Sequence, residues 1–176
     1  MAICGDFLHW RVCAMIVRDR EAESVLAQMS DLPTDATLRR AARSAQAAVE
    51  LSGEVTVLLT DDAGIRRLNR RFRRKNKATD VLSFPAAEPE FGVAGDLAIS
   101  VETAARQAAA EGHRLGIELR VLMLHGMLHL AGMDHETDGG QMASREAVLR
   151  QQLRLPLGLI ERVTTPRRSA GRTRAR

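Results

Sequence analysis

The pattern of apolar and polar positions predicts two β-strands in the first third of the chain. Both are β-branched apolar runs that end in charge, RVCAMIVRD over Arg11 to Asp19 and EVTVLLT over Glu54 to Thr60. The Ala- and Arg-rich segment between them, Thr37 to Leu51, has the composition of a helix. Thr34 and Asp35 precede this segment as candidate capping residues, so a helix is predicted between the two strands.

The middle of the chain predicts another helix, which is followed by short strands and further helices. Asp61 and Asp62 are candidate N-caps of a helix that reaches about Phe72, and Ile65 and Leu68 join Phe72 in its apolar stripe. The remaining predicted elements are a strand from Asp80 to Phe84, a loop from Pro85 to Gly95, a strand from Gly95 to Ser100, and helices over Val101 to Glu111, Ile117 to Ala131 and Gly140 to Leu153.

This order of elements predicts an α+β fold in which several helices pack against one mixed β-sheet. Residues 1–165 are expected to form a single domain with its core over about 11–160, because a chain of 176 residues is long enough for one hydrophobic core and short for two. Residues 166–176 are rich in Arg, Ser, Gly and Thr, and we expect them to be a basic disordered tail.

The chain shows no sign of a membrane-spanning or secretory segment. Its longest apolar runs, such as Val121 to Leu124 and Leu155 to Ile160, are far shorter than the roughly 18–20 residues that a spanning helix requires. Residues 1–10 lack the basic, then apolar, then small-residue order of a secretory signal. We therefore expect a cytoplasmic protein with no membrane partner.

The net charge of +4 conceals a strong segregation of basic residues. Eight of them lie between Arg66 and Lys77, and five arginines lie between Pro166 and Arg176. These two segments hold half of the 26 basic residues and none of the 22 acidic ones. Concentrated cationic patches on an otherwise acidic chain indicate a polyphosphate partner such as nucleic acid.

Three histidines in the segment LHGMLHLAGMDH have the spacing of metal ligands. His125 and His129 are four residues apart, so in a helix both rings project from nearly the same side, one turn apart. Gly132 follows at the position where a helix commonly ends in a left-handed residue, which turns the chain back and delivers His135. The sequence therefore predicts one metal site with these three ligands.

The ligand set indicates a catalytic zinc site. Three neutral imidazoles leave a fourth position open for water or substrate, whereas structural zinc sites are usually closed by four protein ligands. A single histidine on an apolar helix face is more often packed or exposed to solvent than bound to metal. His9 and His113 lack any such spacing and are interpreted in that simpler way.

The same spacing resembles the metzincin metallopeptidase pattern His-Glu-x-x-His-x-x-Gly-x-x-His, with one departure. The position of its glutamate, which takes a proton from the metal-bound water, is occupied by Gly126. A peptidase would lack its general base here. A bound metal can still lower the pKa of its water toward about 7 and act as a Lewis acid.

Further motifs resemble the YbeY family of metal-dependent endoribonucleases, also called rRNA maturation factors. Segments appear in the order of the family pattern: Leu68, Asn69 and Arg73 in LNRRFR, then TDVLSFP over Thr79 to Pro85, then Gly95-Asp96-Leu97, then HGMLHLAGMDH. The resemblance extends from about Val55 to Leu153. Small departures are Phe72 for a usual tyrosine, Ala78 for a common proline and Met133 for an aromatic residue or histidine.

The resemblance implies a zincin-like α+β fold with the metal site at the end of a central helix, and one Zn²⁺ per chain bound by His125, His129 and His135. It implies cleavage of single-stranded RNA in late ribosome biogenesis, with maturation of the 16S rRNA 3′ end and ribosome quality control, so that the partners are rRNA and ribosomal particles. Together with the metal ligands, Arg73 is the candidate catalytic residue, because a guanidinium can share the charge of a phosphoryl transition state.

Several alternatives stay open from the sequence. The protein could be a zinc metallopeptidase-like hydrolase, or a zinc-stabilised assembly factor that binds rRNA and cuts nothing. The cations from Arg66 to Lys77 are each typical of a solvated helix face, although together they suit contacts to backbone phosphates. Asp80 and Asp96 fit strand-end caps and partners that orient a histidine equally well, and Asp134 fits a turn or such a partner.

Overall fold

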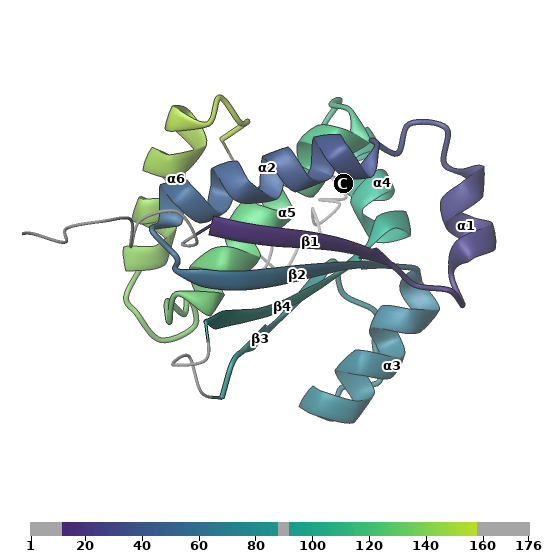
Figure 1. The fold of residues 1–176 in the computed structure, drawn as a ribbon, viewed down its shortest axis with the longest axis horizontal. Helices are drawn as coiled ribbons and strands as arrows, with labels where there is room; N and C mark the ends of the chain where they lie inside the picture. The colour runs from purple at the N-terminus through teal and green to yellow at the C-terminus, as the bar shows by residue number, and fades with distance from the viewer. Residues whose placement is uncertain (1–11, 88–91, 158–176) are drawn as a thin grey trace, which may run out of the picture.

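The structure is a computed structural model, and it describes residues 12–87 and 92–157. A four-stranded mixed sheet has the order β1-β2-β4-β3 (Figure 1). Strands β1 (Val12–Arg18), β2 (Gly53–Thr60) and β4 (Val93–Ser100) are parallel, and β3 (Val81–Pro85) pairs antiparallel with β4 at one edge. Residues 1–11 and the predicted basic tail, residues 166–176, lie outside the described residues.

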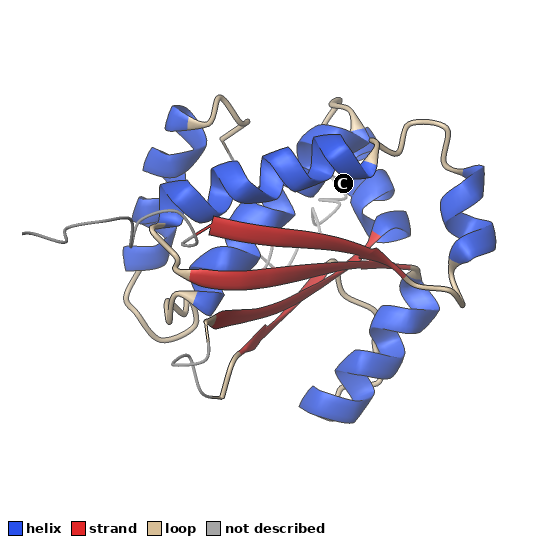
Figure 2. Cartoon of the chain, in the orientation of Figure 1, coloured by secondary structure: helices blue, strands red, loops and turns tan. Residues whose placement is uncertain are grey.

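The described residues form six helices, which pack around this sheet (Figure 2). Their bounds are α1 Glu23–Gln28, α2 Asp35–Val49, α3 Asp62–Arg73, α4 Val101–Ala110, α5 Leu115–Leu130 and α6 Gln141–Gln152. The predicted α+β class with a mixed sheet is confirmed. Helix α1 was not predicted, because six residues with one buried side chain, Leu26, are too few to show a helical period.

The helices form two unequal layers on the sheet. Helix α5 contacts both α2 and α4 on one face, where Val57, Leu59 and Leu97 are fully buried. Helix α3 packs on the other face, where its Ile65 forms a small cluster with Leu82 of β3. Because α5 is apolar on nearly all sides, it is a buried central helix.

The predicted capping residues begin their helices as expected. The Thr34 side chain accepts a hydrogen bond from the backbone N–H of Thr37 at the start of α2, and Asp61 accepts one from Gly64 at the start of α3. The predicted apolar stripe of α3 is wrong at Phe72, which is 56% exposed. Phe72 lies in the last turn of α3, and its ring contacts that of Phe84 edge-on.

The loop predicted from Pro85 to Gly95 is too long, because the structure extends both strands into it. Pro85 is the last residue of β3, and β4 already begins at Val93. The bonds from Ser100 N–H to the Asp80 carbonyl and from Ala86 N–H to the Ala94 carbonyl set the phase of this ladder. In that phase the nitrogen of Pro85 points away from β4, so the edge strand tolerates a residue without an N–H.

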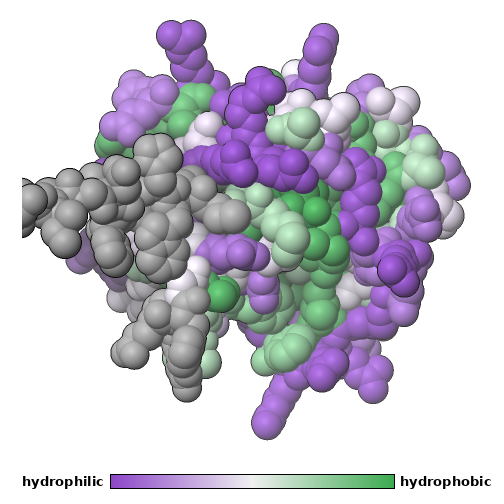
Figure 3. Space-filling view, viewed as in Figure 1, coloured by the Kyte–Doolittle hydropathy of each residue, from purple (hydrophilic) through white to green (hydrophobic). Residues whose placement is uncertain are grey.

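Apolar side chains gather over the strands in the middle of the face drawn in Figure 3, whereas much of the surrounding surface is hydrophilic. Met15 and Val17 of the edge strand β1 are among the exposed apolar residues. In the part of the chain that the structure describes, no helix is long and apolar enough to cross a membrane.

Candidate metal centre

The three predicted histidines converge beside the C-terminal end of α5. His125 and His129 lie one turn apart on α5, and His135 follows in the connection to α6. One ligand atom from each ring lies within 4.8 Å of the other two. The Nε2 atoms of His125 and His129 are 3.2 Å apart. The group could therefore hold one metal ion.

The turn that delivers His135 is a Schellman motif. Gly132 has a φ of +85°. Its N–H donates to the His129 carbonyl at 3.0 Å, while the N–H of Met133 donates to the Leu128 carbonyl at 3.1 Å. These two bonds satisfy carbonyls at the end of α5 and reverse the chain. Gly132 therefore ends the helix in a left-handed conformation, as predicted.

Asp134 stabilises the turn that follows. Its Oδ1 accepts a hydrogen bond of 3.1 Å from the N–H of Glu136, and its Oδ2 accepts one of 3.2 Å from the Thr137 hydroxyl. The bond from Glu136 is the main cause of a lowered pKa of Asp134. Of the two interpretations left open, the turn-forming aspartate matches these contacts.

Glu146 of α6 is a residue of this site that the sequence analysis missed. Its Oε2 lies 2.9 Å from Nδ1 of His125, and its Oε1 pairs with Arg150. Glu146 is fully buried and Arg150 is 2% exposed. The available clue was that both charged residues occupy the apolar stripe of the last helix, with Met142 and Leu149.

The protonation states suit metal binding. Burial, followed by the neighbouring rings of His125 and His135, lowers the pKa of His129 to about 4, so this imidazole is neutral at pH 7. Burial alone would raise the pKa of Glu146, but the hydrogen bond and charge of His125, together with Arg150, lower it. A neutral histidine and an ionised carboxylate partner are the forms that a metal site requires.

The distances also fit a zinc ion. Tetrahedral zinc with Zn–N bonds of about 2.0–2.1 Å separates two ligand nitrogens by about 3.3–3.4 Å. The 3.2 Å between the Nε2 atoms of His125 and His129 is close to that separation. In addition, Nδ1 of His135 is buried without a hydrogen-bond partner among the described residues. The three rings are therefore compatible with one imidazole-bound metal.

Gly126 allows α5 to lie close against the sheet. A Cβ at this position would lie 2.7 Å from Cδ2 of Leu97 on β4 and 3.3 Å from Oγ of Ser83 on β3. The Ser83 hydroxyl donates a 3.1 Å hydrogen bond to the Gly126 carbonyl. A side chain at position 126 would thus point into the packed sheet, and a glutamate there has no room.

A cleft of about 350 Å³ joins the histidines to the end of the basic helix. Arg73, Lys75 and Lys77 line it together with all three histidines. Asn69, which is buried, fixes the backbone of the two lysines, because its Nδ2 donates to the Lys77 carbonyl at 2.7 Å and its own carbonyl accepts from the N–H of Lys75 at 3.3 Å. The structure therefore brings the candidate catalytic arginine and the candidate ligands to one cavity.

The cations of the cleft are not neutralised by ion pairs. Arg73, Lys75 and Lys77 are exposed, and no carboxylate among the described residues forms an ion pair with any of them. Glu136 is an acidic residue that lines the same cleft. Unpaired cations beside the histidines favour an anionic ligand.

The other candidate residues do not contact the histidines. Asp80 accepts hydrogen bonds from the N–H of Val81 at 2.8 Å and from Nε2 of Gln107 at 3.0 Å, so it caps the start of β3. Asp96 is exposed on β4, opposite Phe84. His113 pairs with the buried Glu118 at 2.6 Å, away from the cluster, as the simpler interpretation predicted.

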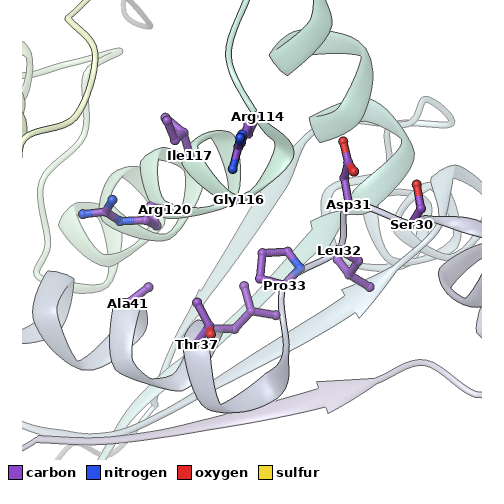
Figure 4. Close-up of a pocket in the computed structure, with 11 residues that line it drawn as sticks. Ser30, Asp31, Leu32, Pro33, Thr37, Ala41, Arg114, Gly116, Ile117 and Arg120 are labelled. Carbon is purple, nitrogen blue, oxygen red and sulfur yellow. The ribbon is translucent and has the colours of Figure 1, made fainter.

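Larger cavities lie elsewhere on the described part of the protein, but they lack a cluster of metal-binding side chains. One of about 690 Å³ lies between the connection from α1 to α2 and the start of α5 (Figure 4). Asp31, Arg114 and Arg120 are the charged residues of its lining, and the Arg120 side chain donates to the Leu153 carbonyl. Because this lining holds no histidine or cysteine, it does not compete with the cleft as a metal site.

An α+β fold in which a central helix and the turn after it present three histidines to a cation-lined cleft is typical of metal-dependent hydrolases. The comparisons with known proteins narrow this class. The chain belongs to the YbeY family of endoribonucleases, because the family model described as Endoribonuclease YbeY matches residues 18–154. The predicted family and the predicted enzyme class, an endoribonuclease, are confirmed.

Two relatives illustrate the match. The chain is 53% identical over 132 residues to the Endoribonuclease YbeY of Koribacter versatilis (strain Ellin345), which covers 75% of this chain and 86% of the relative. It is 53% identical over 133 residues to that of Solibacter usitatus (strain Ellin6076), with 73% and 88% covered. The solution structure of TM1509 from Thermotoga maritima superposes with a TM-score of 0.49 at 22% identity, over 80% of this chain and 91% of that chain.

Proposed function

We propose that this protein is a zinc-dependent endoribonuclease specific for single-stranded RNA that acts late in ribosome biogenesis. Its proposed tasks are maturation of the 16S rRNA 3′ end and quality control of rRNA and ribosomes, with rRNA and ribosomal particles in the cytoplasm as its partners. The observation that supports this most is the single cleft lined by His125, His129, His135 and Arg73.

The histidines would hold one zinc ion. Three neutral imidazoles leave a coordination position open, which is the composition of catalytic zinc sites. When bound, the ion supplies Lewis acidity toward a phosphoryl oxygen. The low pKa of His129 keeps one of these ligands ready to bind at neutral pH.

Arg73 is the proposed clamp for the scissile phosphate. Its guanidinium lines the cleft and can share the negative charge that grows on phosphoryl oxygens in the transition state. Lys75 and Lys77 would bind the flanking phosphates as point charges. The exposed cations Arg70, Arg71 and Arg74 continue this surface along α3.

The dimensions of the cleft favour a single strand. Its volume of about 350 Å³ is at the small end of ligand pockets, which suits one unstacked nucleotide. Unstacked bases of single-stranded RNA can be splayed into such a cavity. Gly126 argues against the peptidase alternative, because no carboxylate occupies the position of that base.

The test compares wild-type protein with His129→Ala, Arg73→Ala and the control Arg39→Ala, an exposed arginine of α2 outside the cleft. Bound zinc is measured by elemental analysis, and cleavage is measured on single-stranded and duplex RNA of one sequence. We expect His129→Ala to lose zinc and activity. Arg73→Ala should keep zinc and lose roughly 10²–10³-fold in cleavage rate, as for one transition-state donor. Arg39→Ala should match wild type.

Other results would replace the proposal. Equal RNA cleavage by all four proteins would identify a contaminating nuclease. Cleavage of casein but not RNA by the zinc-loaded protein would favour the metallopeptidase. Normal rRNA maturation in cells that carry Arg73→Ala, together with unfolding on zinc removal, would favour the non-catalytic assembly factor.

A further inference from the structure

Glu146 links the histidine cluster to the last helix. It extends from α6, is fully buried, and places Oε2 2.9 Å from Nδ1 of His125. Since an ionised carboxylate has only acceptors, Nδ1 of His125 must carry the proton of this hydrogen bond. The lone pair of His125 then lies on Nε2, the atom that faces His129 at 3.2 Å. The carboxylate thereby selects the tautomer that can bind a metal.

Arg150 holds the carboxylate in that position. It lies one turn after Glu146 on α6, pairs with Oε1, and donates a 3.2 Å hydrogen bond to the Pro156 carbonyl. With one oxygen bound to Arg150 and the other to His125, Glu146 has little rotational freedom. The pair also balances the negative charge inside the protein, so burial of the carboxylate is tolerated.

A purely structural role in attaching α6 does not account for these contacts. Helix α6 also buries Met142 and Leu149, which belong to the main hydrophobic core. Replacing a buried ion pair by apolar residues is often neutral for stability. Other core contacts of α6 are therefore available to attach it, whereas the bond of the carboxylate to Nδ1 bears directly on a ligand.

We infer that Glu146, fixed by Arg150, is a positioning residue that orients His125 and strengthens its bond to the metal. A carboxylate behind a ligand histidine commonly contributes 10- to 100-fold in metal affinity. This inference rests on the proposed function only in requiring that the three histidines bind metal. It does not depend on RNA as the substrate.

The experiment measures zinc affinity by competition with a chromophoric chelator for the whole chain. The variants are Glu146→Gln, the double variant Glu146→Gln/Arg150→Met, and the control Glu118→Gln. The control removes the charge of another fully buried glutamate that pairs with a histidine, His113, and that lies on α5 itself. Urea unfolding without metal and the visible spectrum of the cobalt-substituted protein are recorded for each variant.

We expect Glu146→Gln to bind zinc roughly 10- to 100-fold more weakly and to change the cobalt spectrum. The double variant should regain stability in urea, because no buried charge is left unpaired, while its zinc affinity stays low. Glu118→Gln should keep the wild-type affinity and spectrum. If the double variant recovers affinity together with stability, or Glu146→Gln binds like wild type, Glu146 is only structural. Failure of the wild type to bind zinc would instead refute the proposed metal site.

Discussion

Gly126 offers a direct test of why a histidine cluster with peptidase spacing has no peptidase base. In Gly126→Ala, the added Cβ would lie 2.7 Å from Cδ2 and 3.2 Å from Cδ1 of Leu97. Leu97 is fully buried, so it cannot swing away into solvent. Helix α5 must shift off β4 or Leu97 must leave its rotamer, and His125 is the residue next to the strain.

Two opposing contributions set the expected change in the free energy of unfolding of Gly126→Ala. Alanine in place of glycine within a helix contributes about 1 kcal/mol of stability. Overpacking of a well-packed core costs about 1–3 kcal/mol. We therefore expect Gly126→Ala to lower the free energy of unfolding by about 1 kcal/mol. Gly126→Glu should be worse by several kcal/mol, because it also buries a charge without a partner.

Leu97→Val provides the control, since it shortens the side chain that causes the overlap. Gly126→Ala is made in both backgrounds, and urea unfolding of the zinc-free proteins is followed by far-UV circular dichroism. In the Leu97→Val background the substitution should become neutral or stabilising by up to about 1 kcal/mol. If alanine stabilises both backgrounds equally, position 126 is not sterically closed, and the absence of glutamate needs another explanation.

Further predictions concern pH, the attachment of α5 and the basic helix. Between pH 6.5 and about 4 the unfolded chain binds a proton at His129 that the folded zinc-free protein does not. The free energy of unfolding should therefore fall as pH is lowered through this range. The decrease in urea midpoint from pH 7 to 5 should be smaller in His129→Gln than in the wild type. An unchanged pH dependence in that variant would contradict the reasoning. Ser83→Ala removes the hydrogen bond to the Gly126 carbonyl and should cost about 1 kcal/mol in urea unfolding, and wild-type stability would show that the bond is not needed. Arg70→Gln/Arg74→Gln should reduce the slope of log affinity for single-stranded RNA against log salt by roughly 0.7 per lost phosphate contact, and an unchanged slope would exclude these residues from the RNA surface.

Much of the fold was predictable because local interactions specify it. Thr34 and Asp61 cap their helices by hydrogen bonds within three residues, so the signal is contained in short segments. Phe72 shows the limit of this approach, since its helical period placed it in an apolar stripe whereas its side chain is mostly exposed in the structure. Pro85 shows another, because its place in β3 depends on which edge of the strand is unpaired.

The histidine cluster was predictable for a similar reason. His125 and His129 share a helix, and the turn at Gly132 ends that helix through two backbone bonds that span three and five residues. Such geometry follows from helix period and turn stereochemistry alone. Glu146 was not predictable from spacing. It reaches His125 because α6 packs on α5, and the connection between these helices takes a path that depends on the whole core.

The sequence by itself determined most of the elements, the three candidate ligands and the family, because each of these is written in short segments with fixed spacing. Only the tertiary structure decided that Arg73 lies in the same cleft as the histidines, that a carboxylate from the last helix stands behind His125, and that Leu97 closes position 126. These residues are 21 to 62 positions apart in the chain, and they come together because α5 packs closely against the sheet and the last helix, which no local pattern encodes.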